Sequence, residues 1–183
     1  MHSVAPLCAL TATLLLAACG TAPPSADVPP LPGFDAVAAV TAIRAIGGAG
    51  ATELDVQPLR DPQVEDLRQQ AAGLETRRSY RAAADALDQA LAINPDDPAL
   101  LQERAETGLL LHEWADAERL AQRAYATGSK VGPLCRRHWE TIAQARVLRT
   151  VSSTHASGAA TPPDAVDARR QRDACTLVAR NRF

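Results

Sequence analysis

Two consecutive stretches of 34 residues, 64–97 and 98–131, carry similar side chains at corresponding positions. Shifting the chain by 34 residues aligns Leu67 with Leu101, Ala71 with Ala105, Tyr80 with Trp114, Ala83 with Ala117 and Ala90 with Ala124. An internal period of this length is typical of stacked helix–turn–helix units. It predicts an all-α fold. The composition agrees, because the chain is rich in alanine and only 3% aromatic.

Pairs of Asp and Pro mark the expected starts of the repeated units, at Asp61-Pro62 and Asp97-Pro98. An aspartate can cap free amides while proline fits the first helical turn. Outside the repeats, apolar spacing predicts a short helix from Phe34 to Ile46, a helix from Gly132-Pro133 to about Arg149, and a last helix over 164–180. The stretch 151–163 is expected to be a loop, since it is rich in Ser, Ala and Thr.

The register resembles the tetratricopeptide repeat, whose pattern has a bulky residue at position 4, small residues at 8, 20 and 27, an aromatic at 17 and proline at 32. The first unit matches with Leu67, Ala71, Tyr80, Ala83, Ala90 and Pro95. The second matches except at its end, where Ser129 replaces proline. The resemblance implies a short helical solenoid of two units over 64–131, with capping helices over 132–183 and a flanking helix and loop over 34–60.

In similar repeats, the first helix of each unit lines a concave binding face. Carried over position by position, this implies a groove lined by Arg68, Glu75, Gln102, Glu106, Leu109 and, if the capping helix continues the stack, Arg136 and Glu140. Alternating charges with little aromatic surface would suit an extended or helical polypeptide of mixed charge. Ala72 and Glu106 stand at the ninth position, where chaperone-binding relatives carry Asn, so that binding mode is not expected.

The N-terminus reads as an export signal over 1–18, because its apolar stretch is too short to span a bilayer. Leu16-Ala17-Ala18-Cys19 resembles the bacterial lipobox, which implies lipidation at Cys19. Gly20 in place of Asp points to the outer membrane, with the chain facing the periplasm. Residues 19–33 contain five prolines and are expected to form a tether. An unmodified thiol behind an ordinary cleaved signal is the alternative.

Four cysteines occur in the chain. Removal of Cys8 with the signal and modification of Cys19 would leave Cys135 and Cys175. Two antiparallel capping helices would bring the start of one near the end of the other, and the periplasm is oxidising. We therefore expect a Cys135–Cys175 disulfide, with two buried thiols as the alternative.

Residue types that carry chemistry are scattered along the chain. The histidines are isolated and no cysteine pair has ligand spacing, so no metal site or cofactor is expected. Ser152 and Ser153 near His155 lack a carboxylate, and the Glu103 and Glu106 pair is more typical of a hydrated helix face. Near-balanced charge, 19 basic against 21 acidic residues, does not favour a nucleic-acid partner.

The expectation is therefore a non-enzymatic, lipid-anchored module that binds a protein or peptide. The alternatives are a cell-envelope enzyme such as a peptidoglycan hydrolase, and a structural subunit that assembles with copies of itself. Self-assembly is considered because two repeats are fewer than such folds usually need. Arg169, Arg170 and Arg172 in the last helix could provide a basic surface for anionic lipid or an acidic partner.

Overall fold

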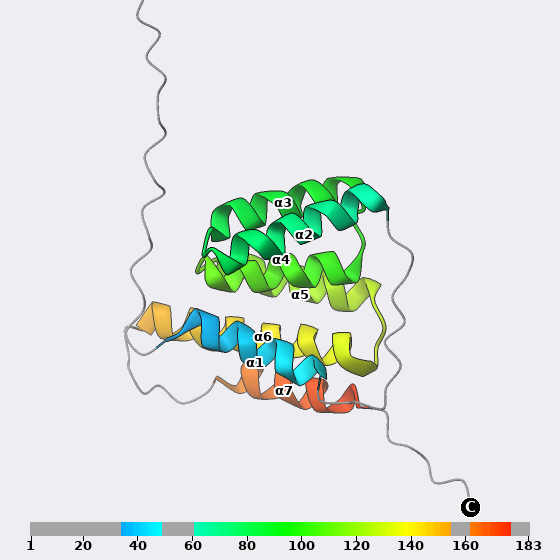
Figure 1. Ribbon diagram of the computed structural model, residues 1–183. Helices are drawn as coiled ribbons and strands as arrows, with labels where there is room; N and C mark the ends of the chain where they lie inside the picture. Colours follow the sequence, from blue (N-terminus) through cyan, green and yellow to red (C-terminus); the bar gives the residue numbers. More distant parts are fainter. Residues whose placement is uncertain (1–33, 49–60, 155–161, 177–183) are drawn as a thin grey trace, which may run out of the picture.

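In the computed structural model, the described residues are 34–48, 61–154 and 162–176, and they form seven α-helices with no strand among them (Figure 1). The all-α prediction is confirmed. The helices are α1 (Ala36–Gly48), α2 (Pro62–Thr76), α3 (Tyr80–Ile93), α4 (Pro98–Leu110), α5 (Trp114–Thr127), α6 (Gly132–Thr154) and α7 (Pro163–Ala174). The predicted signal segment, Cys19, the tether and the loop 49–60 lie outside the described residues.

From α2 onward, each helix packs against the next one in the chain. The pairs α2–α3 and α4–α5 fall in the two 34-residue stretches, and α6–α7 follows as a third pair. Figure 1 shows these pairs arranged one beyond the other. The arrangement is compatible with a helical solenoid, in which contacts run mainly between neighbours.

The two predicted helix starts are capped as the local chemistry requires. Asp61 Oδ1 accepts a hydrogen bond from the Gln63 amide at 2.8 Å. Asp97 Oδ1 accepts from the amides of Ala99 at 2.8 Å and Leu100 at 3.2 Å. In both helices proline occupies the first turn, where its missing N–H costs nothing.

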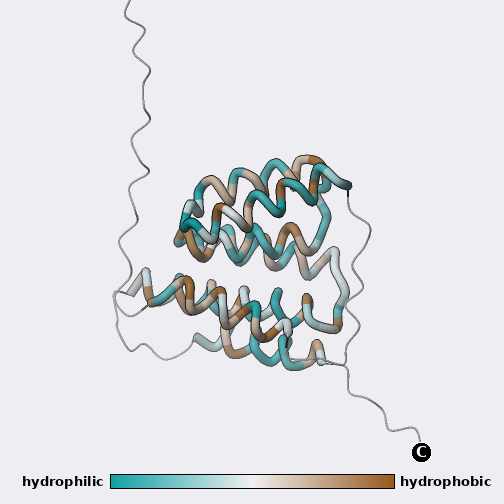
Figure 2. Tube along the Cα trace, viewed as in Figure 1, coloured by the Kyte–Doolittle hydropathy of each residue, from teal (hydrophilic) through white to brown (hydrophobic). Residues whose placement is uncertain are grey.

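The core is built from small side chains at the aligned positions. All six aligned alanines of the two stretches are buried, at 2% exposure or less: Ala71, Ala83, Ala90, Ala105, Ala117 and Ala124. Alanine lets helix backbones approach closely, and leucines such as Leu87 and Leu101 fill the remaining space. Apolar and polar residues are interspersed along the helices (Figure 2). No described helix is long and apolar enough to cross a membrane.

A disulfide joins Cys135 at the start of α6 to Cys175 just after α7, with the two Cα atoms 5.8 Å apart. This pairing agrees with the sequence prediction and with an antiparallel arrangement of the two packed helices. Helix α6 runs to Thr154, so residues 151–154, predicted as the start of a loop, are helical. The added turn is used in packing, because Ser152 Oγ accepts from Trp114 Nε1 at 3.1 Å.

Helix α1 lies outside the series of helix pairs and packs across α6 and α4 (Figure 1). It runs two residues beyond the predicted Ile46, through Gly47 and Gly48. Its buried residues Val40 and Ile43 join Leu109 of α4 and Leu148 of α6 in one apolar cluster. The N-terminal flanking helix therefore covers part of the face for which a groove was predicted.

Candidate functional site

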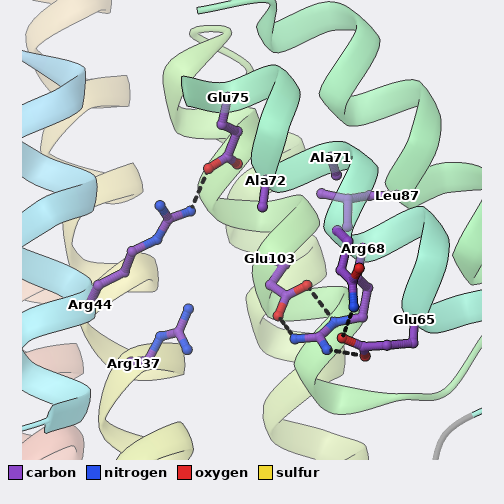
Figure 3. Close-up of a pocket in the computed structure, with 10 residues that line it drawn as sticks. Arg44, Glu65, Arg68, Ala71, Ala72, Glu75, Leu87, Glu103 and Arg137 are labelled. Carbon is purple, nitrogen blue, oxygen red and sulfur yellow. Dashed lines mark hydrogen bonds and ion pairs between the residues drawn. The ribbon is translucent and has the colours of Figure 1, made fainter. Parts of the chain in front are cut away.

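A groove separates α1 from α2, and we call it the α1–α2 groove. It has two lobes, with volumes of about 260 Å³ and 300 Å³, which share Arg44, Ala72 and Glu75. The first lobe is drawn in Figure 3 and is lined by Arg44, Glu65, Arg68, Gln69, Ala71, Ala72, Glu75, Leu87, Glu103 and Arg137. The second is lined by Val37, Val40, Thr41, Arg44, Ala72, Glu75, Thr76, Tyr80 and Leu110.

Arg68 forms the charged end of the first lobe (Figure 3). Its Nε donates to Glu103 Oε2 at 2.9 Å and its Nη2 to the other oxygen of the same carboxylate. Its Nη1 donates to Glu65 Oε2 at 2.7 Å. The hydrogen bond to Glu103, together with the two negative charges, raises the pKa of Arg68. Arg68 is thus a fixed cation held between α2 and α4.

Arg44 bridges the groove from α1 to α2 and α4. Its Nη2 donates to Glu75 Oε2 at 2.9 Å, as Figure 3 shows, and its Nε donates to Glu106 Oε2 at 2.7 Å. Burial acts against the charged guanidinium, but the two carboxylates outweigh it and raise the pKa of Arg44. Glu75 is held in turn by Thr107, whose hydroxyl donates to Glu75 Oε1 at 2.7 Å.

Glu106 is fully buried and lies where α1, α4 and α6 meet. Its Oε1 accepts from Arg137 Nη2 at 2.6 Å and from Gln102 Nε2 at 2.7 Å, and its Oε2 accepts from Arg44. A buried carboxylate is tolerated only when charges and donors surround it, as they do here. Glu106 therefore organises the junction beneath the groove and does not line an open face.

Gln102 is also buried, in the interface between α4 and α6. Its Nε2 donates to Thr141 Oγ1 at 2.8 Å as well as to Glu106, so its Oε1 is left to accept from His138 Nδ1 at 2.7 Å. His138 Nε2 is buried with no hydrogen-bond partner among the described residues. Burial, with the positive charges of Arg137 and Lys130, lowers the pKa of His138 to about 3.

The predicted groove positions on α6 are wrong in register. Arg137 lines the first lobe, whereas Arg136 is 7% exposed and its Nε donates to the carbonyl of Ile46 at 3.3 Å. Glu140 faces α7, where it pairs with Arg172 at 2.6 Å. The 34-residue shift does not hold in α6, because the side of this helix that faces α4 carries His138, Thr141 and Arg137.

The seven predicted groove residues thus divide into two groups. Arg68 and Glu75 line the α1–α2 groove. The other five are buried, because α1, α6 and α7 cover them: Gln102, Glu106, Leu109, Arg136 and Glu140. The prediction that these five line an open face is therefore wrong. The prediction missed Arg44, Ala72 and Arg137. Ala72 was identifiable from its ninth position in the first unit, whereas Arg44 lies outside the repeats.

Carboxylates pair with the arginines that make the last helix, α7, rich in positive charge. Arg170 pairs with Asp167 at 2.9 Å, and Arg172 pairs with Glu140 and with Asp173. Burial opposes charge on Arg172, but the hydrogen bonds and charges of Asp173 and Glu140 raise its pKa. The arginines of α7 are therefore largely neutralised by neighbouring carboxylates.

The side chains weighed for catalysis have structural partners. Glu103 holds Arg68, and Glu106 holds Arg44 and Arg137. Ser152 bonds Trp114 and the Leu148 carbonyl, while His155 lies outside the described residues. Within the described ranges, no group of three or more His, Cys, Asp or Glu side chains is placed to hold a metal ion.

Comparison of the chain with protein-family models, with curated proteins and with solved structures finds no match. The α1–α2 groove is therefore interpreted from its own geometry.

Proposed function

We propose that this protein is a lipid-anchored adaptor of the bacterial cell envelope, which binds a segment of another protein in the α1–α2 groove. The observation that carries the proposal is the groove itself. Its two lobes meet at Ala72, and its walls alternate the guanidinium groups of Arg44 and Arg68 with the carboxylates of Glu75 and Glu103. Alternating charge around the apolar lining residues Ala71, Ala72 and Leu87 suits a polypeptide whose own charges alternate.

The proposal places the protein at the outer membrane, facing the periplasm and held by a lipid on Cys19. The lipobox-like sequence before Cys19 and the proline-rich stretch after it support this placement. The tetratricopeptide-like register supports binding over catalysis.

Photo-crosslinking at Ala72 tests the binding role. A benzophenone amino acid replaces Ala72 in the full anchored chain, in cells that produce it, and adducts are identified by mass spectrometry. Ala82 is the matched control, because it is an exposed alanine of α3 that lines neither lobe. We expect an adduct with one envelope protein at position 72 and none at position 82. Equal labelling at both positions, or none at either, rejects the groove as the binding site.

Replacement of Cys19 tests the anchor. Cys19→Ser removes the thiol that would carry the lipid, and we expect the protein to leave the membrane fraction for the soluble periplasmic fraction. Mass spectrometry of the wild-type N-terminus should find a lipid-modified cysteine. Retention of the variant in the membrane fraction with unchanged gel mobility contradicts lipid anchoring.

A further inference from the structure

Helix α1 contacts the rest of the fold as a bound helical peptide would. Three of its 13 residues are buried, Val40, Ile43 and Gly47, and they form a single stripe at i, i+3 and i+7. The opposite side of the helix, which carries Ala38, Ala42 and Ala45, is exposed. Amphipathic helices bind receptor proteins in this way, by placing one apolar stripe against an apolar surface of the receptor.

The surface beneath α1, which we call the helix seat, has an apolar floor. Leu109 of α4 and Leu148 of α6 pack against Val40 and Ile43, together with Ala117 and Ala145. These floor residues belong to three different helices of the series α2–α7. The floor is therefore built by the scaffold, and α1 supplies only the stripe that covers it.

The helix seat also recognises a cation at one position. Arg44, four residues after Val40 and beside the stripe, donates to Glu106 and to Glu75. Both carboxylates are oriented by donors of the scaffold: Arg137 and Gln102 hold Glu106, and Thr107 holds Glu75. The acceptors are thus positioned by contacts that do not involve α1, so a guanidinium from another helix would find them in place.

A third set of contacts recognises the end of the helix. Arg136 Nε donates to the carbonyl of Ile46, which places a positive charge at the helix C-terminus, where the helix dipole favours it. Gly47 lies against the Arg137 side chain so closely that a Cβ atom there would stand 2.5 Å from Arg137 Cδ. At Gly48 a Cβ would meet nothing within 4 Å. The seat therefore favours a very small residue at i+7, where a larger one would have to displace the Arg137 side chain, and tolerates a larger residue after it.

We propose that α1 is a displaceable internal ligand of the helix seat, and that the partner presents a helix of the same pattern. That helix has aliphatic residues at i and i+3, an arginine at i+4 and a very small residue at i+7. The inference rests on the proposed adaptor function and deepens it by naming the partner segment. In this scheme partner binding releases α1, and the groove and the seat become one continuous surface.

A peptide of residues 34–48, with a fluorophore at its N-terminus, tests the seat directly. Its binding is measured by fluorescence anisotropy to three full chains: wild type, Ile43→Glu and Ala42→Glu. Ile43 is fully buried and Ala42 is exposed, so only the first substitution should release α1. Hydrogen exchange of the α1 amides reports the release, and far-UV circular dichroism reports that the remaining helices persist.

We expect the Ile43→Glu chain to bind the peptide at least about tenfold more tightly than wild type or Ala42→Glu, because α1 blocks the seat in those two chains. A peptide carrying Arg44→Glu should lose at least about tenfold in affinity, since it places a carboxylate against Glu106 and Glu75. Equal affinity of all three chains for the peptide, or none in a folded Ile43→Glu chain, overturns the proposal.

Gly47→Val provides a second route, with Gly48→Val as its control. Valine at 47 should release α1 by contact with Arg137, while valine at 48 should not. Unfolding of both Ile43→Glu and Gly47→Val overturns the proposal, because α1 is then an integral part of the core. A wild-type dimer that depends on Ile43, seen by light scattering, also overturns it, since a second copy would then occupy the seat.

The peptide experiment and the crosslinking at Ala72 fail independently. Peptide binding needs no cellular partner, so it can succeed when no adduct forms at position 72. In that case the α1–α2 groove is rejected as the binding site while the helix seat stands. An adduct at position 72 without peptide binding supports the adaptor function and rejects the displaceable helix.

Discussion

Arg78 and His112 lie 34 residues apart and adopt the same left-handed backbone conformation, with φ of 59° and 62°. Each occupies the turn inside a helix pair, after α2 and after α4 respectively. The hydrogen bonds around them also correspond, since the Ser79 amide donates to the Leu74 carbonyl at 2.9 Å and the Glu113 amide to the Gly108 carbonyl at 2.8 Å. The 34-residue period therefore extends to backbone geometry that side-chain matching alone did not reveal.

Replacing Arg78 by glycine should stabilise the protein. Residues other than glycine strain the left-handed region, and glycine is favoured at this position after a helix. We expect a gain of about 0.5 kcal/mol in the free energy of unfolding, after allowing for the greater freedom of glycine in the unfolded chain. Arg77 is the control, because its φ of −87° needs no glycine, and Arg77→Gly should be destabilising. Urea titration of both variants measures their free energies of unfolding. Destabilisation by Arg78→Gly would contradict the prediction.

Removing the charge of Glu106 should weaken the junction of α1, α4 and α6. Glu106→Gln leaves Arg44 and Arg137 facing a neutral group at a fully buried position. We expect a loss of about 2–3 kcal/mol in unfolding free energy, at or just below the range for breaking a buried pair, because the side chains of Arg44 and Arg137 are partly exposed to water. Glu65→Gln is the control. Its side chain is 40% exposed, and the loss of its charge should cost about 0.5 kcal/mol or less. Similar urea midpoints for the two variants would refute the expectation.

Stability should fall as the pH is lowered below about 6.5, partly because of His138. Its pKa is about 3 in the fold and 6.5 in the reference state, so within this window the unfolded chain binds a proton that the folded chain does not. The contribution of the neutral buried histidine to the free energy of unfolding is therefore fully present above about pH 6.5. It is lost as the pH falls towards the folded-state pKa of about 3, by up to about 1.4 kcal/mol per pH unit.

His138→Asn should flatten this pH dependence, because an amide can donate to Gln102 without titrating. Thermal melts of both chains between pH 7 and 5 provide the measurement. Burial also lowers the pKa of His112, so the variant should keep a smaller slope of the same sign. Parallel curves for the two chains would show that His138 does not account for the loss.

Reducing the Cys135–Cys175 disulfide should destabilise the α6–α7 pair. The two cysteines are separated by 40 residues in the sequence, and opening a loop of that size costs about 4 kcal/mol in the chain-entropy description. Urea unfolding with and without reductant measures the difference. The double variant Cys135→Ser/Cys175→Ser is the control, and reductant should not affect it. Two free thiols in protein purified without reductant would contradict the bond itself.

Local chemistry was sufficient to predict several features of this fold from the sequence. Asp61 and Asp97 cap helices through amides only two or three residues away, so their role is readable from neighbouring positions. The buried alanines follow the 34-residue period, because each unit repeats the same packing. The Cys135–Cys175 pair followed from counting cysteines and from the antiparallel arrangement of two successive helices.

The groove depended on contacts that no local pattern encodes. Arg44 and Glu106 are 62 residues apart, and only the packing of α1 across α4 and α6 brings them together. A glutamate at the ninth position of a repeat reads as solvent-exposed when the repeat alone is considered. The tertiary structure buries Glu106 because α1 covers it, and the burial is stable because Arg44, Arg137 and Gln102 satisfy its two oxygens.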